Sequence, residues 1–202
     1  MYSYNVDCIL VTYHPDILLL NRVLDGILFQ IRNCYVINNG VQYFCYSTNN
    51  ITIVNLGRNY GIAYAQNYGI ELAKRHNADF VLLSDQDTIY PEDFISKMLD
   101  VYEHTEDKEH IGAITPIFYD KNKDRSSAIM ATKFYSIIPE SHKIYTVAHT
   151  ISSGSLIPME NLKIIGFMRE ELFIDYVDTE WYWRALKYGY KILSIPAVAI
   201  KH

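Results

Sequence analysis

The sequence has few cysteines, and this scarcity limits the class of protein that it can encode. Cys8, Cys34 and Cys45 are the three present in 202 residues. An odd number of cysteines argues against a closed disulfide framework, and these three share no short spacing of the metal-ligand type. The cysteine content therefore favours a reducing, cytoplasmic setting.

Long hydrophobic runs and an excess of basic residues are also missing. No run approaches the roughly 18 apolar residues that a membrane span needs, and no Lys- or Arg-led apolar segment opens the chain. Lys and Arg number 18 against 23 Asp and Glu, which gives a net charge of -5. Nothing therefore indicates a nucleic-acid partner. With 50% hydrophobic residues, the composition is that of one ordinary globular domain.

Strands and helices alternate through the first half of the sequence. Apolar runs predict strands at residues 6–13, 34–37, 51–54 and 80–83, and helical spacing of apolar residues predicts helices at 17–30 and 61–76. This alternation predicts an α/β fold with a mostly parallel sheet flanked by helices on both faces. In such folds ligands bind beyond the carboxyl ends of the strands.

The alternation stops after residues 111–115. Residues 119–150 mix charged residues, Ser and Tyr, which predicts loops with a hairpin. A helix is expected at about 179–187 and a final strand at 192–195. We expect residues 1–202 to form a single domain.

Asp85-Gln86-Asp87 follows directly on the apolar strand at residues 80–83. Because the chain leaves the strict alternation of a strand there, both carboxylates can direct oxygen at one divalent cation, which can neutralise a diphosphate. The alternative is a pair of turn-forming or helix-capping aspartates before Pro91. The position of Asp85-Gln86-Asp87 at a strand's carboxyl end favours a ligand site.

A second group of carboxylates lies far downstream, at Asp175, Asp178 and Glu180. One of them could act as a general base that removes a proton from an attacking hydroxyl. The alternative is structural: Asp178 or Thr179 caps the following helix, and Glu180 favours its first turn. These residues alone leave both interpretations open.

Five segments in order resemble the motifs of family 2 glycosyltransferases, and within them the bacterial rhamnosyltransferases. They are LVTYHP (10–15), NLGRNYGIAYAQNYG (55–69), LSDQD (83–87), SGS (153–155) and FIDYVDTEW (173–181). The resemblance covers nearly the whole chain. It implies a GT-A fold that moves a sugar from a nucleotide diphosphate donor to a hydroxyl, usually with inversion. It also implies a nucleotide-sugar-binding half at 1–115 and an acceptor and catalytic half at 116–202.

The resemblance assigns roles to individual residues. Its donor-binding positions are Thr12, Tyr13 and Asn38 beside the nucleoside, Arg58 and Asn59 in the donor-site loop, and Asp85 and Asp87 at the metal (Mg²⁺ or Mn²⁺) and diphosphate. Asp178 matches the second letter of the family's Glu-Asp pair, the usual catalytic base. In two departures from the pattern, Asn38 stands where the family commonly has Asp, and Val177 where it commonly has Glu.

Other candidates lie on the acceptor side or at the end of the chain. Ser153, Gly154, Glu180 and Trp181 are the acceptor-side candidates. His202 is a candidate third metal ligand, as a histidine after the last strand is in some relatives, with an ordinary terminal residue as the alternative. Relatives tend to continue further, so the resemblance implies that the chain is truncated at its C-terminus.

These assignments agree with the chemistry of sugar transfer. The leaving group is a nucleoside diphosphate, so a metal that spreads its charge lowers the barrier, while a carboxylate across the sugar deprotonates the incoming hydroxyl. The resemblance implies a dTDP- or UDP-linked donor, with dTDP-rhamnose expected. It also implies a glycan or lipid-linked acceptor in surface polysaccharide (O-antigen) synthesis, with peripheral contact at the inner face of the membrane.

Three other classes of protein compete with this interpretation. A haloacid-dehalogenase-type phosphatase also has Asp-X-Asp after a strand, but usually after the first strand, with Thr or Val two residues beyond the second Asp; here Thr88 comes directly after Asp87. A sugar-phosphate nucleotidyltransferase should have a Gly-rich loop after its first strand, and residues 12–16 contain no glycine. A nucleotide-sugar-binding subunit without turnover is the non-enzymatic alternative, and the presence of Asp178 speaks against it.

Overall fold

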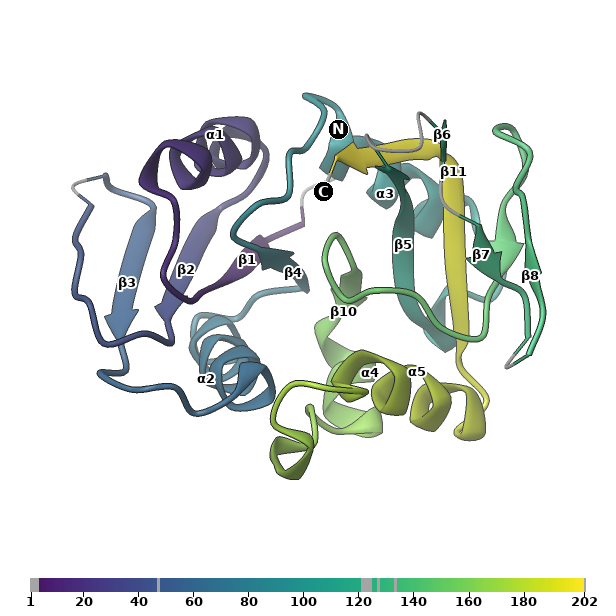
Figure 1. Ribbon diagram of the computed structural model, residues 1–202. Helices are drawn as coiled ribbons and strands as arrows, with labels where there is room; N and C mark the ends of the chain where they lie inside the picture. Colours follow the sequence, from purple (N-terminus) through teal and green to yellow (C-terminus); the bar gives the residue numbers. More distant parts are fainter. Residues whose placement is uncertain (1–3, 47, 121–124, 127, 133, 202) are drawn as a thin grey trace.

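A computed structural model describes residues 4–46, 48–120, 125–126, 128–132 and 134–201 (Figure 1). Its main sheet has the strand order β3-β2-β1-β4-β10-β5-β11-β9, with β6 paired to β5, and β7 and β8 form a separate two-stranded sheet. The strands are β1 Val6–Thr12, β2 Asn33–Asn38, β3 Ile51–Asn55, β4 Phe80–Asp85, β5 Ile111–Asp120, β6 Arg125–Ser126, β7 Ile129–Met130, β8 Ser136–Ile137, β9 Tyr145–Thr146, β10 Leu156–Pro158 and β11 Lys191–Lys201.

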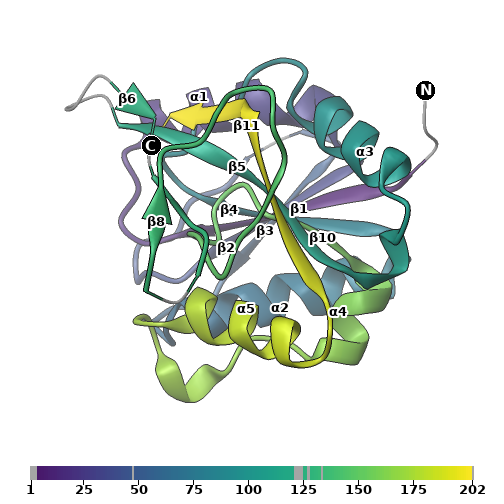
Figure 2. The same cartoon turned by 90° about the vertical axis from the view of Figure 1, so that its right-hand side faces the viewer.

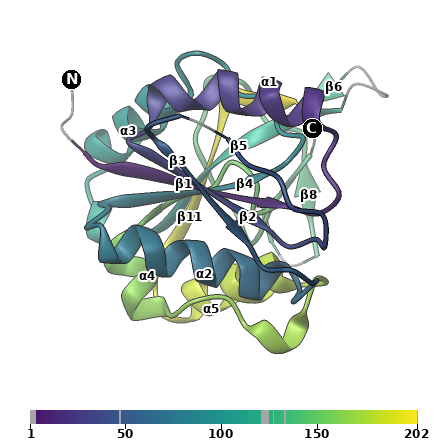
Figure 3. The same ribbon diagram turned by 90° about the vertical axis from the view of Figure 1, so that its left-hand side faces the viewer.

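Helices cover both faces of this sheet. The α-helices are α1 Ile17–Ile27, α2 Ile62–Arg75, α3 Phe94–His104, α4 Met159–Ile165 and α5 Val177–Lys187, and the short 3₁₀ helices are η1 Leu28–Gln30, η2 Lys108–His110 and η3 Glu170–Leu172. Figures 2 and 3 show α1 and α3 on one face and α2, α4 and α5 on the other. None of the helices in the described ranges has the length and apolarity needed to span a bilayer.

The sheet is mostly parallel, as the alternating pattern predicts. β3, β2, β1 and β4 pair in parallel, and β11 pairs in parallel with β5. The short β10 runs antiparallel between β4 and β5, which joins strands from the two halves of the chain in one sheet. The hairpin expected within residues 119–150 is formed by β7 and β8.

Strand β1 lies in the middle of the core. Its side chains alternate, with Ile9 and Val11 in the cluster under α2, α4 and α5, and Cys8 and Leu10 in the cluster under α1 and α3. Both faces are covered, so the strand is an unbroken apolar run instead of an alternating one. This burial also accounts for two of the cysteines, since Cys8 and Cys34 are both fully buried and free.

Candidate active site at the carboxyl ends of the strands

The register of the sheet gathers polar residues at one edge. Thr12 at the end of β1 pairs with Asn38 at the end of β2, and Asn38 pairs with Asn55 at the end of β3. On the other side of β1, Val11 pairs with Asp85 at the end of β4. Parallel strands that end in step therefore place the predicted nucleoside and diphosphate residues along one edge.

Gln86 ties the Asp85-Gln86-Asp87 segment to the end of β1. Its Oε1 accepts a hydrogen bond of 2.7 Å from the Tyr13 backbone N–H, and its Nε2 donates one of 3.2 Å to the Tyr13 carbonyl. The middle residue is thus an anchor that fixes the turn in which Asp87 lies. The phenol ring of Tyr13 is about half exposed, at 48%, beside this anchor.

Ser153 and Gly154 support Asp85 from behind. The Ser153 hydroxyl accepts a 3.0 Å hydrogen bond from the Asp85 N–H and lies 2.7 Å from the Thr88 hydroxyl. Gly154 donates its N–H to the Leu83 carbonyl at 2.8 Å. Ser153 and Gly154 are both buried. In this structure the two residues hold the end of β4, and the predicted acceptor contacts at these positions stay a prediction.

Residue types other than glycine do not fit at position 154. The φ of Gly154, +84°, is in the left-handed region, and a Cβ there would lie 2.7 Å from Cγ of Pro116.

Nearby, the buried Tyr182 hydroxyl lies 2.5 Å from the Ser155 hydroxyl and donates to the Ile151 carbonyl at 3.2 Å. Burial raises the pKa of Tyr182, so the phenol keeps its proton and ties α5 to the segment that supports Asp85.

Ser153→Ala tests this support. The variant removes the acceptor of the Asp85 N–H and the partner of Thr88, so we expect the free energy of unfolding to fall by about 1–2 kcal/mol. Urea denaturation measures the change. Ser136→Ala, at an exposed serine in β8, is the matched control and should change stability by less than about 0.5 kcal/mol. Equal effects of the two variants would contradict a supporting role for Ser153.

Asp85 and Asp178 line the same small cavity. It has a volume of about 150 Å³, and its polar lining comes from Asp85, Asp178, Gln66 and Ser152. Ile174 and Val177 contribute apolar walls. Two carboxylates that the sequence separates by almost half its length are thus brought to one site by β4 and α5.

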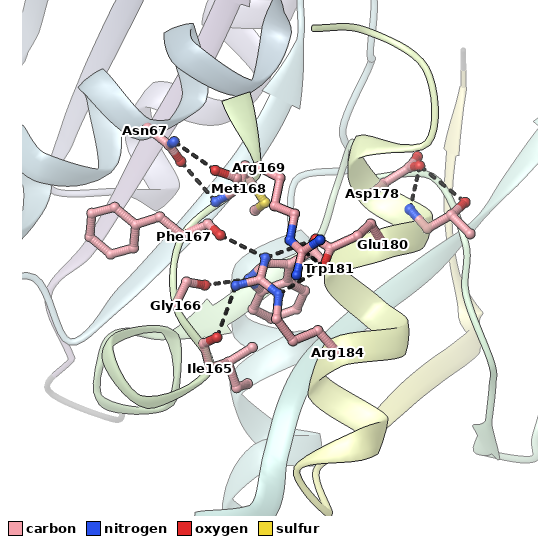
Figure 4. Close-up of polar contacts among 11 residues, drawn as sticks. Asn67, Ile165, Gly166, Phe167, Met168, Arg169, Asp178, Glu180, Trp181 and Arg184 are labelled. Carbon is pink, nitrogen blue, oxygen red and sulfur yellow. Dashed lines mark hydrogen bonds and ion pairs between the residues drawn. The ribbon is translucent and has the colours of Figure 1, made fainter. Parts of the chain in front are cut away.

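The start of α5 shows how Asp178 is presented. Tyr176 occupies the N-cap position with φ 62° in the left-handed region, and no side chain caps the helix. Asp178 lies in the first turn, where the helix dipole favours a negative charge, and its Oδ1 accepts a 2.6 Å hydrogen bond from the Thr179 N–H (Figure 4). The structural alternative that Asp178 or Thr179 caps this helix is therefore wrong, although Glu180 does lie in its first turn.

The loop before α5 docks onto the start of α2. The Phe173 carbonyl accepts a 2.7 Å hydrogen bond from the Ile62 N–H, which satisfies one of the open donors at the N-terminus of α2. A Cβ on residue 61 would lie only 2.6 Å from the Phe173 carbonyl oxygen, so this position requires glycine. This contact holds Ile174 at the wall of the cavity.

Glu180 and Trp181 point away from the cavity. The Trp181 side chain is only 1% exposed, and its Nε1–H donates to the Gly166 carbonyl at 2.8 Å (Figure 4). The Glu180 carboxylate pairs with Arg184 at 2.9 Å and with Arg169 at 3.0 Å. The ring of Trp181 therefore packs in the core, and acceptor contact at this position stays a prediction. Glu180 lines a different hollow, with Arg169 and Arg184.

Asn38 has a structural reason to be an amide. Its Nδ2 donates to the Gln42 carbonyl at 2.7 Å and to Asn55 Oδ1 at 2.6 Å, while its Oδ1 accepts from the Gly40 N–H at 3.1 Å. An ionised Asp only accepts hydrogen bonds, so it would lose both donated contacts. The amide of Asn38, in place of the family's usual Asp, therefore fits the hydrogen bonds that hold this loop. Thr12, fully buried next to it, has no partner for its Oγ1 within the described ranges.

Asn59 joins the ends of β2 and β3. Its Oδ1 accepts hydrogen bonds of 2.9 Å from Asn39 Nδ2 and from the Gly61 N–H. Asn39 in turn accepts from the Tyr60 N–H at 2.8 Å. Arg58 is exposed, and its guanidinium lies 4.2 Å from the centre of the Tyr60 ring. Both predicted loop residues therefore lie at the strand ends.

Three residues at the site were not expected from the sequence: Gln66, Gln86 and Ser152. Each lies inside or beside a segment that carries the family resemblance, which is the signal that could have found them. His202, the candidate third metal ligand, lies outside the described residues. Among the residues that are described, no three or more His, Cys, Asp and Glu side chains form a group that could hold a metal.

The mostly parallel sheet flanked by helices on both faces has the GT-A fold of glycosyltransferases. Residues 35–170 match the model of Glycosyl transferase family 2. The chain belongs to this family and is a glycosyltransferase. The phosphatase and the non-catalytic subunit are not favoured.

Individual relatives are consistent with this assignment. The chain is 34% identical over 209 residues to dTDP-rhamnosyl transferase RfbF of Shigella flexneri, covering 98% of this chain and 69% of the relative. Its fold is similar to GalNAc-T7 solved with UDP, GalNAc and Mn²⁺ (TM-score 0.77, 11% identity, 98% of this chain and 44% of that one). It is also similar to S. aureus TarS 1-349 in complex with UDP (TM-score 0.66, 14% identity, 98% of this chain and 60% of that one).

Proposed function

We propose that this glycosyltransferase moves rhamnose from dTDP-rhamnose to a hydroxyl of a glycan or lipid-linked acceptor, with inversion, in surface polysaccharide synthesis. The observation that carries the proposal is the cavity that Asp85 and Asp178 share. The relative named dTDP-rhamnosyl transferase supports the choice of donor. The family resemblance supports a cytoplasmic location at the inner face of the membrane.

The roles of the two aspartates follow from their positions. Asp85 ends β4 beside the nucleoside residues of β1 and β2, so it faces the diphosphate of the donor. Asp178 lies across the cavity on α5, where its carboxylate would take the proton of the attacking hydroxyl. Attack from the side opposite the leaving diphosphate inverts the anomeric carbon. Residues 1–115 would then hold the donor, and residues 116–202 would supply the base and the acceptor surface.

The aspartate motif fits a divalent cation of the Mg²⁺ or Mn²⁺ type. Asp85 and Asp87 offer hard carboxylate oxygens, and Mg²⁺ is commonly held by one or two carboxylates together with substrate phosphates instead of a complete protein cage. When bound, the cation would spread the negative charge of the departing diphosphate.

Thermal stabilisation by nucleotides tests the donor site. We expect dTDP with Mg²⁺ or Mn²⁺ to raise the melting temperature by roughly 5–10 °C at about 100 times its Kd, because a ligand that binds only the folded state stabilises it. The Asp87→Ala variant should lose this metal-dependent shift. UDP, GDP and ADP, with the corresponding nucleotide sugars, complete the panel by differential scanning fluorimetry.

The matched control is Asp25→Ala, at an exposed aspartate of α1 on the far face of the sheet. It removes the same charge from the protein and should keep the full metal-dependent shift. A wild-type protein that no nucleotide stabilises, with or without metal, would sink the donor-site proposal.

A further inference from the structure

Gln66 has an unsatisfied polar atom at the proposed active site. Its residue is 3% exposed on α2, and it lines the cavity with Asp85 and Asp178. The amide Nε2 donates a 3.3 Å hydrogen bond to the Ser152 hydroxyl, which orients the group. The amide Oε1 is buried and has no hydrogen-bond partner in the described part of the chain.

A buried acceptor without a partner is costly, and such atoms in folded proteins are nearly always satisfied. The fold does not leave Gln66 free to swing outward, because it projects from a packed turn of α2. Its neighbours Ala65 and Asn67 are buried, and Asn67 bonds reciprocally with the Met168 backbone at 2.9 Å (Figure 4). The partner of Oε1 is therefore a hydrogen-bond donor inside the cavity, either an ordered water or a group of the substrate that displaces it.

The chemistry of the substrate limits that partner. Diphosphate oxygens and ionised carboxylates only accept hydrogen bonds, so the substrate group that displaces water from Oε1 is a hydroxyl. At about 150 Å³ the cavity is smaller than the roughly 300–1,000 Å³ of sites that enclose a whole drug-sized ligand, so it takes one part of the substrate. The part that lies between the diphosphate side, at Asp85, and the base side, at Asp178, is the sugar ring.

We propose that Gln66 Oε1 accepts a hydrogen bond from a ring hydroxyl of the sugar that is transferred, and that this contact helps to select the sugar. The inference rests on the proposed function of the same cavity. A site that pairs its buried polar atom with a substrate hydroxyl discriminates against analogues that lack the hydroxyl, since the atom is then left without a partner. Ser152 is the positioning residue, because it holds the amide in the required orientation.

The test separates the sugar from the nucleotide. Gln66→Met keeps the side-chain volume nearly unchanged and removes the amide. We expect its affinity for dTDP, in the presence of Mg²⁺, to stay within about twofold of the wild type, and its affinity for dTDP-rhamnose to fall roughly five- to tenfold. Isothermal titration calorimetry gives both values. Glu71→Met, on the same helix, is the control and should change neither.

Deoxy analogues of the donor then identify the hydroxyl. For one analogue that lacks a single ring hydroxyl, wild type and Gln66→Met should bind equally well, because the variant has already lost that contact. The proposal is overturned, without affecting the donor site, if Gln66→Met loses affinity for dTDP and dTDP-rhamnose equally. It is also overturned if the loss is specific to dTDP-rhamnose but no deoxy analogue cancels it. If wild type binds neither ligand, the proposed function itself fails. Should Gln66→Met not fold, Gln66→Ala provides the same comparison.

Discussion

Asp178→Asn is expected to bind the donor as tightly as wild type and to lower kcat for sugar transfer by about 10²–10⁴-fold. An amide at this position still offers an oxygen to the Thr179 N–H, so the first turn of α5 keeps its local hydrogen bond. It does not take up a proton from the attacking hydroxyl. The loss therefore falls on the chemical step and leaves the binding of the nucleotide sugar unchanged.

Two measurements on the same protein check this expectation. Calorimetry with dTDP-rhamnose gives the donor affinity, and a transfer assay at saturating donor, with a panel of glycan and lipid-linked acceptors, gives kcat. Asp175→Asn is the matched control, because Asp175 is exposed in the loop just before α5 and should keep full activity. Wild-type turnover in Asp178→Asn would remove Asp178 from the role of base.

Trp181→Ala is expected to lower the free energy of unfolding by about 3–5 kcal/mol. The indole is 1% exposed among the largest buried side chains of the chain, and it also provides the hydrogen bond to the Gly166 carbonyl. Its removal leaves a cavity between α5 and the loop that follows α4. In a domain of this size, the expected loss corresponds to a fall in melting temperature of roughly 6–20 °C.

Trp183→Ala is the comparison variant, because Trp183 is on the same helix but only half-buried. We expect Trp183→Ala to lower the free energy of unfolding, measured by urea denaturation, by less than Trp181→Ala does. At a temperature where the Trp181→Ala protein remains folded, the KM of Trp181→Ala for the acceptor should match that of wild type. A stable Trp181→Ala protein with a raised acceptor KM would restore the acceptor role that the sequence suggested.

The sequence predicted the elements whose pattern is local. The apolar run of β1, the helical spacing of α2 and the strand before Asp85 appear within a residue or two of their expected positions. Helix α1 ends at Ile27, three residues before the expected end, and the chain continues there as η1. Helix α3 was not identified, although Phe94, Ile95, Met98 and Leu99 are buried at helical spacing. Helix α4 has seven residues and β10 has three, and β10 owes its pairing to distant partners, so no local pattern in the sequence reveals them. The final strand expected at 192–195 lies within the longer β11.

The sequence by itself determined that a pair of aspartates ends a buried strand and that a helix starts close to Asp178, because strand ends and helix starts are short-range features. Only the tertiary structure decided which side chains meet. It brought Asp85, Asp178 and Gln66 to the lining of one cavity, yet turned Trp181 into the core and hydrogen-bonded Ser153 to the Asp85 N–H. Neighbouring residues on a helix or loop face different directions, and a packed core, not the order of residues, selects the direction that each takes.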